Sequence, residues 1–595
     1  MNENSVSGNA GSAPPLAARI SLVFVGLMAV LPFLQFHHAH PLPAFYTEFV
    51  AFALGLMALT LLLSGHFWRN LALPWIALAP LGLFAVLLLQ LNLKMPAYYE
   101  THILAMLYML WAALLVVLGA ILRKEFGLMR VCAALAWFFL VGGELSAAVG
   151  IIQHYGIHTF LDAFIAVKNH AAVYGNVGQT NHFANHIGLA LASLVFLFGV
   201  KKLGRTTAVS LALPLLFVLA LSGQRSPWLY LFALLALSLL LLWSGKASME
   251  GRRLTTASCL LIAGFALMQW LVHTPLFATS MGTITATDRL FEQVGGTAIR
   301  FYLWREAWQM FLQAPLLGVG WGQYAWHHFQ LSATTNNPEI AGVYSHAHNL
   351  VIDLLAESGI AGTLPVVAGI TLWLQGLKRQ PFDLALWWLL AAFALMGIHS
   401  MLEFPLWYGH YLGLAAFLFG VGETRFAQLR LPRLGNWAML LILVSGWSTM
   451  AKTERDYRLI ESVMPPPDGT HKNTRSNHFS ALLPLHQKTL LSPYVDFALG
   501  NAMELNRNNL DLKLAVNQRL IQFNPSPPVI YKQAVLLALK GDHAAAIKLV
   551  EGIGPAFPEH LEKFSESLGI LEAEHPGSMS TLIQWADGKR EKKRG

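Results

Sequence analysis

Apolar residues along the chain fall into long runs separated by short polar stretches, and this alternation predicts helices that span a membrane. A hydrocarbon core of about 30 Å needs roughly 20 mainly apolar residues in a helix. Such runs recur from residue 18 to residue 450. We therefore predict an all-α polytopic membrane helix bundle of about thirteen spans, some of which can be re-entrant, near residues 18–36, 44–64, 71–92, 103–122, 129–152, 183–200, 207–221, 227–244, 254–272, 349–374, 384–402, 408–421 and 436–450.

Positively charged residues are unevenly distributed over the connections between these spans. Cytoplasmic connections of membrane proteins carry an excess of Lys and Arg. The short odd-numbered connections hold only Lys94, Lys168 and Arg225. The N-terminus and the even-numbered connections are therefore predicted to be cytoplasmic, and an odd number of spans places the C-terminal part on the other side. The even-numbered connections hold Arg69, Arg123, Lys124, Arg130, Lys201, Lys202, Arg205, Lys246, Arg252, Arg253, Lys378, Arg379, Arg425, Arg430 and Arg433.

The predicted organisation has three parts. Residues 1–17 are rich in Ser, Gly, Ala and Pro, and we expect a flexible cytoplasmic segment without a cleavable signal peptide. Residues 18–451 form the membrane domain, with long non-cytoplasmic connections at 153–182 and 273–348. Residues 452–595 have a soluble composition, and Ala-rich runs such as the one broken at Gly541-Asp542 predict a C-terminal α-helical domain.

Composition supports lipid as the solvent and argues against two other classes of protein. The chain is 55% hydrophobic and 12% charged, with a mean hydropathy of +0.50, whereas soluble domains average about 25% charged. A pI near 9.3 does not indicate a nucleic-acid-binding protein here, because the basic residues lie in short loops between spans. Cys132 and Cys259 lie inside apolar runs, so neither a disulfide framework nor a thiolate metal cluster is predicted.

The most informative polar stretch lies where the long loop enters the tenth predicted span. Asn349, Asp353 and Glu357 recur there at helical spacing, so the face they share must turn away from lipid. His346 and His348 precede that face. A neutral imidazole can take a proton from a hydroxyl group, which makes both residues candidate bases. The alternative is that they are only amphipathic residues of the membrane interface.

Arginines collect on the same predicted side of the membrane. Arg225 follows the seventh span, and Arg289, Arg300 and Arg305 lie in the long loop. A guanidinium near lipid is costly unless an anion is close, and its planar fork binds phosphate oxygens bidentately. The pattern therefore predicts a phosphate-containing ligand, although for Arg225 alone a side chain that snorkels from a helix end is the alternative.

A second polar cluster precedes and opens the sixth predicted span. It contains Gln179, Asn181, His182 and Asn185. Amides and imidazoles at this density suit sugar hydroxyls, because each offers hydrogen-bond donors and acceptors. For Asn185 alone we prefer polar helix capping.

A third cluster, from His399 to Tyr408, follows the eleventh span. His399 and Glu403 are spaced i,i+4, which predicts that they are side-chain partners on one helix. Pro405 is expected to end that helix.

Other candidate motifs carry little weight. The sequence Gly-Val-Gly-Trp-Gly at 318–322 lacks the strand and the lysine of a phosphate loop, so it predicts a turn. His37, His38 and His40 look like a metal tract but have no carboxylate or Cys neighbours. Zinc-protease, Ser-His-Asp and Walker signatures do not occur in the sequence, and we expect no metal and no other cofactor.

These motifs resemble the O-antigen ligase and polymerase superfamily. The resemblance rests on residues 346–349 and 357–362, preceded by Arg300 and by residues 315–322. Within that superfamily, the second and third clusters resemble the bacterial protein O-oligosaccharyltransferases of the PglL type. The similarity spans nearly the whole chain, including a helical C-terminal domain.

The resemblance implies a multi-pass enzyme of the bacterial inner membrane whose site and C-terminal domain are periplasmic. Such an enzyme transfers a preassembled glycan from a polyprenyl-diphosphate carrier to Ser or Thr hydroxyls of a periplasmic acceptor such as pilin, without a metal or a nucleotide sugar. The predicted partners are therefore the lipid-linked oligosaccharide, the acceptor protein and membrane lipid, and not nucleic acid. Ligation of O-antigen to lipid A-core and polymerisation of repeat units are alternatives, as is a lipid-linked glycan flippase, although we find no inverted repeat.

The resemblance also implies roles for individual residues. His348 matches the family's functional His and is the predicted base of an inverting displacement. Arg225 and, less securely, Arg300 match the arginines that contact the diphosphate, and Arg305 is the alternative to Arg300. One departure is Gln224, where many relatives have Ser. The residues predicted to position substrate are Gln179 and Tyr408, which match the family, together with Asn181, His182, Asn349, His399 and Glu403.

Overall fold

The structure of this chain is a computed structural model that describes residues 14–63, 67–68, 70–245, 248–277, 282, 284–286, 288, 295–335, 342–464, 482–551, 557 and 560–594. Helices dominate these residues, and the strands among them form one two-stranded sheet. The predicted all-α membrane fold is confirmed.

Nine helical segments of the described residues are long and apolar enough to cross a membrane. Every one of them coincides with a predicted span, and four shorter apolar helices coincide with the remaining spans. The exact number of crossings stays a prediction. The long segments are α1 (Leu16–Leu27) with the turn Pro32–Leu34, α3 (Leu78–Asn92), α4 (Tyr99–Phe126), α5 (Leu128–Tyr155), α6 (Thr180–Gly199), α8 (Ser226–Trp243), α9 (Ser248–Leu271), α13 (Leu350–Leu377) and α16 (Pro432–Val463). The short ones are α2 (Phe45–Leu61), α7 (Arg205–Leu221), α14 (Leu384–Ser400) and α15 (Gly409–Gly422).

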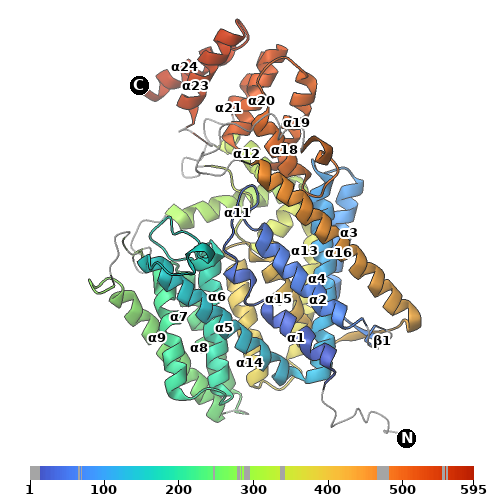
Figure 1. The fold of residues 1–595 in the computed structure, drawn as a ribbon, viewed down its shortest axis with the longest axis vertical. Coiled ribbons are helices and arrows are strands. Elements are labelled where there is room, and N and C mark those ends of the chain that lie inside the picture. Colours follow the sequence, from blue (N-terminus) through green and yellow to red (C-terminus); the bar gives the residue numbers. More distant parts are fainter. Residues whose placement is uncertain are drawn as a thin grey trace.

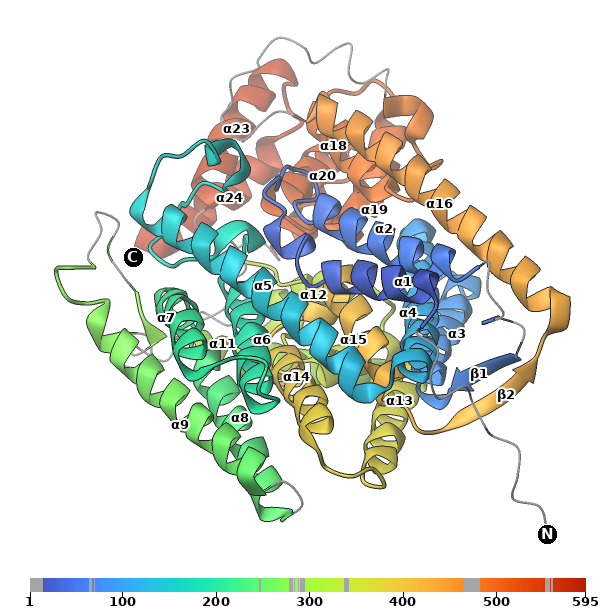
Figure 2. The ribbon, with the colours of Figure 1, turned by 60° about the horizontal axis from the view of Figure 1, so that its bottom comes forward.

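The apolar helices form one bundle, and the C-terminal helices lie beyond one of its ends (Figure 1). We call this end the domain end. Toward the other end, β1 (Asn70–Pro74) pairs antiparallel with β2 (Phe426–Arg430) and joins the segments before α3 and after α15 (Figure 2). There the Arg123 guanidinium donates to the carbonyl oxygens of Val421 and Glu423, both at 2.8 Å. The helix α16 continues well past Met450, where the composition changes, and leans across the outside of the bundle.

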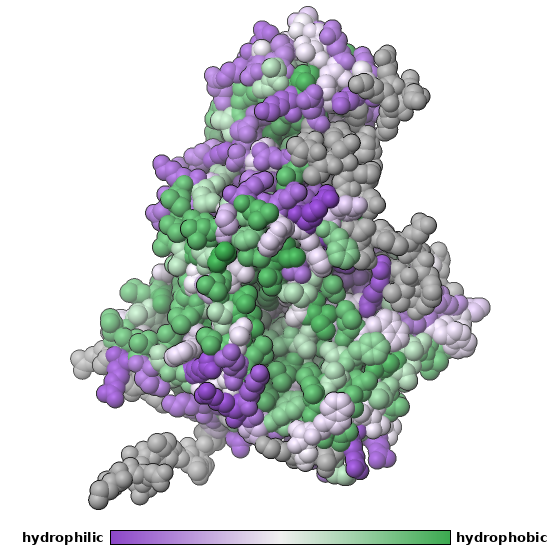
Figure 3. Space-filling model, turned by 180° about the vertical axis from the view of Figure 1, so that it is seen from behind, coloured by the Kyte–Doolittle hydropathy of each residue, from purple (hydrophilic) through white to green (hydrophobic). Residues whose placement is uncertain are grey.

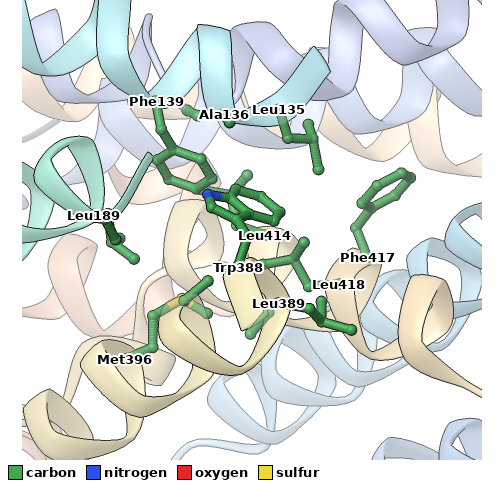
Figure 4. Packing of buried hydrophobic residues seen from close by; sticks show 14 of the residues in the cluster. Leu135, Ala136, Phe139, Leu189, Trp388, Leu389, Met396, Leu414, Phe417 and Leu418 are labelled. Atoms are coloured by element: carbon green, nitrogen blue, oxygen red, sulfur yellow. The ribbon is translucent and has the colours of Figure 1, made fainter. Parts of the chain in front are cut away.

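Interlocking aromatic and aliphatic side chains fill the interior of the bundle. Trp388 of α14 packs between Phe139 of α5 and the Leu residues of α6 and α15 (Figure 4). Its indole nitrogen donates to Ser193 Oγ at 3.0 Å, so the buried ring leaves no unpaired polar atom. Glycines let two other helices approach closely: a Cβ at Gly420 of α15 would collide with the backbone of Val116 in α4. The outer surface is largely apolar, whereas hydrophilic residues gather on the C-terminal helices and at the opposite end (Figure 3).

A second layer of helices covers the domain end. It consists of α11 (Gly295–Gln313) and α12 (Tyr324–Thr335) from the long loop, and of α18 (Ser492–Ala502), α19 (Leu510–Phe523), α20 (Pro527–Lys540), α21 (His543–Glu551), α23 (Leu561–Glu574) and α24 (Ser580–Arg594). The predicted break at Gly541 is confirmed, because that residue ends α20 with φ +93°. Phe329 of α12 belongs to the same apolar core as α19 and α20, so the long loop and the C-terminal helices pack as one unit.

A turn at residues 315–320 docks against a kink in α13. Gly359 interrupts that helix with φ +60°, a conformation that favours glycine, and a Cβ there would collide with Leu316. The freed backbone groups pair with the turn: Ile360 N donates to Pro315 O at 2.9 Å and Val319 N donates to Ala356 O at 2.9 Å. The predicted turn at 318–322 is confirmed, and its Gly residues have positive φ. Two motifs that are distant in the sequence therefore form one structural unit.

Candidate active site

His348 and Glu403 form a hydrogen-bonded pair at the domain end of the bundle. His348 Nδ1 lies 3.0 Å from Glu403 Oε2. The imidazole is 20% exposed and the carboxylate 6%, so the pair is shielded but reachable. His348 has φ +53°, which is uncommon for a residue with a side chain and costs free energy that the surrounding contacts must supply. Because Nδ1 is bonded to a carboxylate, Nε2 is left as the proton acceptor of a neutral ring.

Glu403 connects this histidine to two other elements. Its second oxygen, Oε1, accepts a hydrogen bond from Asn181 Nδ2 at 2.8 Å, at the start of α6. The Arg300 guanidinium of α11 lies 3.5 Å from the same oxygen and is 32% exposed. One carboxylate thereby links the loop before α13, the first turn of α6 and the long-loop helix α11. A positive charge and the candidate base therefore contact the same carboxylate.

The predicted side-chain pair of His399 and Glu403 is wrong. The helix α14 ends at Ser400, and the chain turns through Met401 and Leu402, so Glu403 leaves the helical face that carries His399. Glu403 instead turns toward His348 and Asn181. His399 is 1% exposed and lies in the bundle interior.

Arg225 is linked to the residues around Glu403 by its sequence neighbour Gln224. Gln224 Nε2 donates to Thr180 Oγ1 at 2.6 Å, and Thr180 precedes the Asn181 that contacts Glu403. The half-buried Arg225 guanidinium has no hydrogen-bond or ion-pair partner among the described residues. A half-buried cation without a counter-charge is suited to binding an anionic ligand. The contact also gives Gln224, the departure from the family pattern, a structural role.

The other two arginines differ from Arg300. Arg305 is exposed, and its guanidinium stacks over the Tyr302 ring at 5.4 Å. Its contacts do not reach the His348–Glu403 pair. Arg289 lies outside the described residues. The geometry therefore distinguishes Arg300 from Arg305, which the sequence left open.

A second histidine–carboxylate pair lies two residues before the first. His346 Nδ1 is 3.0 Å from Asp353 Oδ2, and the other carboxylate oxygen accepts a hydrogen bond from Ala347 N at 2.8 Å. Phe404 separates the pairs, since its ring stacks on His346 at 4.3 Å and lies 5.3 Å from His348. The predicted inward turn of Asp353 and Glu357 is confirmed, because both are buried. The Asn349 side chain accepts hydrogen bonds from the first backbone N–H groups of α13 and so caps that helix.

The residues of the predicted sugar-binding cluster make contacts within the protein. The Gln179 side chain caps α6 by accepting from His182 N at 3.1 Å. The His182 ring is buried edge-on against His399 and Tyr408. The Tyr408 phenol offers a hydrogen-bond donor beside that ring. Gln179 and Tyr408 therefore both contact His182, one at its backbone N–H and the other at its ring.

No group of three or more His, Cys, Asp or Glu side chains among the described residues is arranged to hold a metal ion. In the histidine tract, His37 Nε2 lies 2.7 Å from Glu461 Oε1 and His38 Nε2 donates to Asn176 O at 2.7 Å. These residues join the loop after α1 to α16 and to the loop before α6.

The hydrogen-bond partners of the candidate functional side chains were not predicted from the sequence. Glu403 was expected to contact substrate, and its contact with His348 had no local signal because 55 positions separate the two residues. Thr180 and Gln224, which bring Arg225 to α6, are also not neighbours in sequence. The signal that was available is chemical: an acidic residue in a membrane protein requires a partner.

This chain matches two protein families and is similar to individual proteins of known name. Residues 209–367 match the O-antigen ligase family, and residues 387–568 match the family described as virulence factor membrane-bound polymerase, C-terminal. A general O-oligosaccharyltransferase from Acinetobacter baylyi is 24% identical over 448 residues, which is 74% of this chain and 76% of that protein. A ComP-specific O-oligosaccharyltransferase from the same organism is 26% identical over 297 residues, about half of either chain. Two segments of this chain thus match families of O-antigen ligases and membrane-bound polymerases, and over about three quarters of its length the chain is similar to a protein O-oligosaccharyltransferase.

Proposed function

We propose that this protein is a glycosyltransferase that moves a preassembled glycan from a polyprenyl-diphosphate carrier to Ser or Thr hydroxyls of an acceptor protein such as pilin. The observation that carries the proposal is the His348–Glu403 pair with Arg300 beside it, at one end of an apolar helix bundle. A base next to a cation suits transfer from an anionic leaving group to a hydroxyl. The relatives' names favour a protein as the acceptor.

The reaction is a single displacement in this proposal. The acceptor hydroxyl oxygen attacks the anomeric carbon of the first sugar, and its proton passes to His348 Nε2. The bond between that carbon and the diphosphate oxygen breaks, and its electron pair stays on the diphosphate. One displacement inverts the anomeric configuration. The products are a glycosylated Ser or Thr and the polyprenyl diphosphate.

The arginines stabilise the charge that grows on the leaving diphosphate. Arg225 has no counter-charge among the described residues, and Arg300 shares Glu403 with the base. Donors placed where charge develops in the transition state are typically worth about 3–4 kcal/mol each. Gln179 and Tyr408 position the first sugar or the acceptor. This chemistry uses neither a metal nor a nucleotide sugar.

We place the enzyme in the bacterial inner membrane with the site and the C-terminal helices in the periplasm. The basic connections of the chain support this orientation, since Arg123 and Arg425 lie at the end of the bundle that is opposite the site. A lipid-linked donor and a secreted acceptor then meet on the same side of the membrane.

Polymerisation of glycan repeat units is the second candidate function. It is supported by the match of residues 387–568 to the polymerase family. The His348–Glu403 pair serves both reactions, because a sugar hydroxyl replaces the protein hydroxyl as the nucleophile. The two functions differ only in the acceptor.

The test is glycan transfer by the full chain reconstituted in liposomes with a lipid-linked glycan and a pilin acceptor, followed by intact-protein mass spectrometry. We expect the acceptor to gain one whole glycan, and His348→Ala to lower the rate by about 10²–10⁴-fold. His158→Ala is the matched control, because that side chain is 95% exposed and lies 3.0 Å from Asp162, in the loop after α5. Glycan chains that lengthen without protein modification would support the polymerase instead, and an active His348→Ala variant would exclude the base role.

A further inference from the structure

Glu48 is a buried carboxylate in the first turn of α2, and its hydrogen bonds lead to Tyr408. Its Oε2 accepts hydrogen bonds from Gly409 N at 2.5 Å and from Tyr108 Oη at 3.1 Å. Its Oε1 lies 3.7 Å from His410 Nδ1. A carboxylate in an apolar helix bundle is costly unless it is paired. Glu48 meets that need with a backbone N–H group that lies 361 positions away in the sequence.

This carboxylate lies at the first turns of two helices. Glu48 belongs to the first turn of α2, and Gly409 is the first residue of α15. The first N–H groups of a helix have no acceptor within it, and a negative charge is favoured beside them. Tyr408 precedes α15, but its side chain makes no capping hydrogen bond. Glu48 of α2 therefore supplies the cap that the residue before α15 does not.

The peptide unit between Tyr408 and Gly409 is hydrogen-bonded at both ends. The Tyr408 carbonyl oxygen accepts from Leu412 N at 2.9 Å and from Tyr411 N at 3.1 Å. On the other side of the unit, Gly409 N donates to Glu48. Because a peptide unit is planar, these contacts fix its orientation and with it the ψ angle of Tyr408, which is 129°. Glu48 thus holds the backbone from which the Tyr408 side chain extends.

Residue 409 permits this contact because it is a glycine. A Cβ added there would lie 2.6 Å from Glu48 Oε2 and 2.8 Å from the Phe52 ring. Both distances are shorter than van der Waals contact, so any other side chain would displace the carboxylate. The absence of a side chain at Gly409 is therefore what allows Glu48 to reach the backbone.

The Tyr408 ring belongs to a row of aromatic rings that reaches His348. It lies edge-on to the His182 ring at 4.9 Å and stacks on the Phe404 ring at 6.0 Å. The Phe404 ring lies 5.3 Å from the His348 ring. A displaced Tyr408 would therefore disturb the packing next to the candidate base.

We propose that Glu48 is a positioning residue of the candidate active site. It acts through the Gly409 N–H group to hold the Tyr408 phenol in one place beside His182 and Phe404. Glu48 does not itself touch the substrate. What the phenol contacts rests on the proposed function, in which Tyr408 positions the first sugar or the acceptor. The placement of Tyr408 by Glu48 can be measured without glycan transfer.

The first test observes Tyr408 directly. The full chain is prepared in detergent with 3-fluorotyrosine at position 408, and its ¹⁹F NMR signal is recorded. We expect Glu48→Ala to shift or broaden this signal by more than its wild-type linewidth, because the Gly409 N–H group loses its acceptor. An unchanged signal would overturn the proposal, whatever the activity of the variant.

Glu423→Ala is the matched control for the loss of a buried carboxylate. Glu423 is 2% exposed and lies toward the opposite end of the bundle, where it accepts hydrogen bonds from the backbone N–H groups of Ile76, Thr424 and Arg425. We expect the signal at position 408 to stay unchanged in this variant. A similar change in both variants would mean that a general loosening of the bundle moves Tyr408, which contradicts the proposal.

The second test is a double-mutant cycle in the reconstituted transfer assay. Glu48→Ala is expected to lower kcat/KM by up to about 10²-fold through misplacement of the phenol hydroxyl, which Tyr408→Phe removes. In the Tyr408→Phe background, Glu48→Ala should then cost less than about twofold more, and additive losses would contradict the proposal. Full activity of Tyr408→Phe would contradict the role of Tyr408 in the proposed function alone, and the ¹⁹F signal would decide on Glu48.

Glu48→Gln tests whether the hydrogen bond is what places Tyr408. The glutamine amide oxygen can still accept from Gly409 N and Tyr108 Oη, so we expect this variant to recover the wild-type ¹⁹F signal and most of the activity that Glu48→Ala loses. Gly409→Ala leaves Glu48 in the chain but displaces its carboxylate, and should change the signal as Glu48→Ala does. A Glu48→Gln variant as impaired as Glu48→Ala, or an unchanged signal in Gly409→Ala, would overturn the proposal.

Discussion

His348 Nδ1 lies 3.0 Å from Glu403 Oε2, although 55 positions of sequence separate the two residues. The contact joins the loop that enters α13 to the loop that leaves α14. Asn181 adds α6 to the same carboxylate through a 2.8 Å hydrogen bond. Three segments therefore fix the imidazole, and its orientation does not depend on the flexible rotation of one side chain. Such fixing is what a general base needs if its free nitrogen is to meet a hydroxyl in one geometry.

Glu403→Gln is expected to lower kcat for glycan transfer by about 10²–10⁴-fold, because the amide removes the negative charge that orients and supports the imidazole. The matched control is Glu461→Gln, since Glu461 makes a similar contact at 2.7 Å with His37, away from the site. Initial rates at saturating donor measure both variants. Comparable losses in the two variants would show that Glu403 supports the fold and not the base.

Arg300→Ala and Arg305→Ala separate two arginines of one helix. Arg300 lies 3.5 Å from Glu403, whereas Arg305 is exposed and stacks on Tyr302. We expect Arg300→Ala to lower kcat/KM for the lipid donor by about 10²-fold or more, and Arg305→Ala to stay within a few-fold of wild type. Initial rates over a range of donor concentrations give kcat/KM for both variants. A larger loss for Arg305→Ala would reassign the diphosphate contact to that residue.

The helices could be predicted from the sequence because the solvent determines them. A segment that crosses lipid must satisfy its backbone polar groups internally, so a long apolar run has few conformations available. The run that became α6 illustrates this, since its interior residues are almost all buried while its start remains polar. The ends were less predictable. The helix α16 passes Met450 because its polar part continues the same backbone hydrogen bonds outside the apolar run.

For the candidate site, single residues could be predicted from the sequence, but the contacts between them could not. His348 stands out locally because it precedes a helix cap and polar residues at helical spacing. Its partner does not, since the i,i+4 rule pairs Glu403 with His399 only if the helix continues, and α14 ends at Ser400. The docking of Gly318 against Gly359 likewise has no periodic signal. Contacts between loops depend on how distant helices pack, and one sequence does not contain that information in a periodic form.

Gly359→Ala is expected to destabilise the protein by about 1–3 kcal/mol, because φ is +60° there and a Cβ would collide with Leu316. Gly397→Ala in α14 is the control: a Cβ there meets nothing within 4 Å, and alanine favours a helix. Thermal unfolding in detergent should show a lower Tm for the first variant only. An unchanged Tm for Gly359→Ala would mean that α13 straightens without cost and that the turn at 315–320 does not require the kink.

One buried carboxylate contributes to the contact between the membrane bundle and the C-terminal helices. Asp496 of α18 is fully buried and accepts hydrogen bonds from Tyr98 Oη at 2.9 Å and from Arg519 Nη2 at 2.7 Å. Asp496 also raises the pKa of Tyr98, after burial, so that phenol remains a donor. The arrangement ties the loop before α4 to α19 through a single side chain.

Asp496→Asn is therefore expected to loosen this junction by about 3–5 kcal/mol, because it leaves Arg519 beside a neutral amide in a partly buried site. Asp511→Asn is the matched control, since its ion pair with Lys540 is exposed, with Asp511 88% accessible, and such pairs contribute about 1 kcal/mol or less. Amide hydrogen exchange in α18 and α19 measures the difference. We expect faster exchange only in Asp496→Asn, and a similar acceleration in both variants would mean that apolar packing, and not the buried carboxylate, holds the C-terminal helices on the bundle.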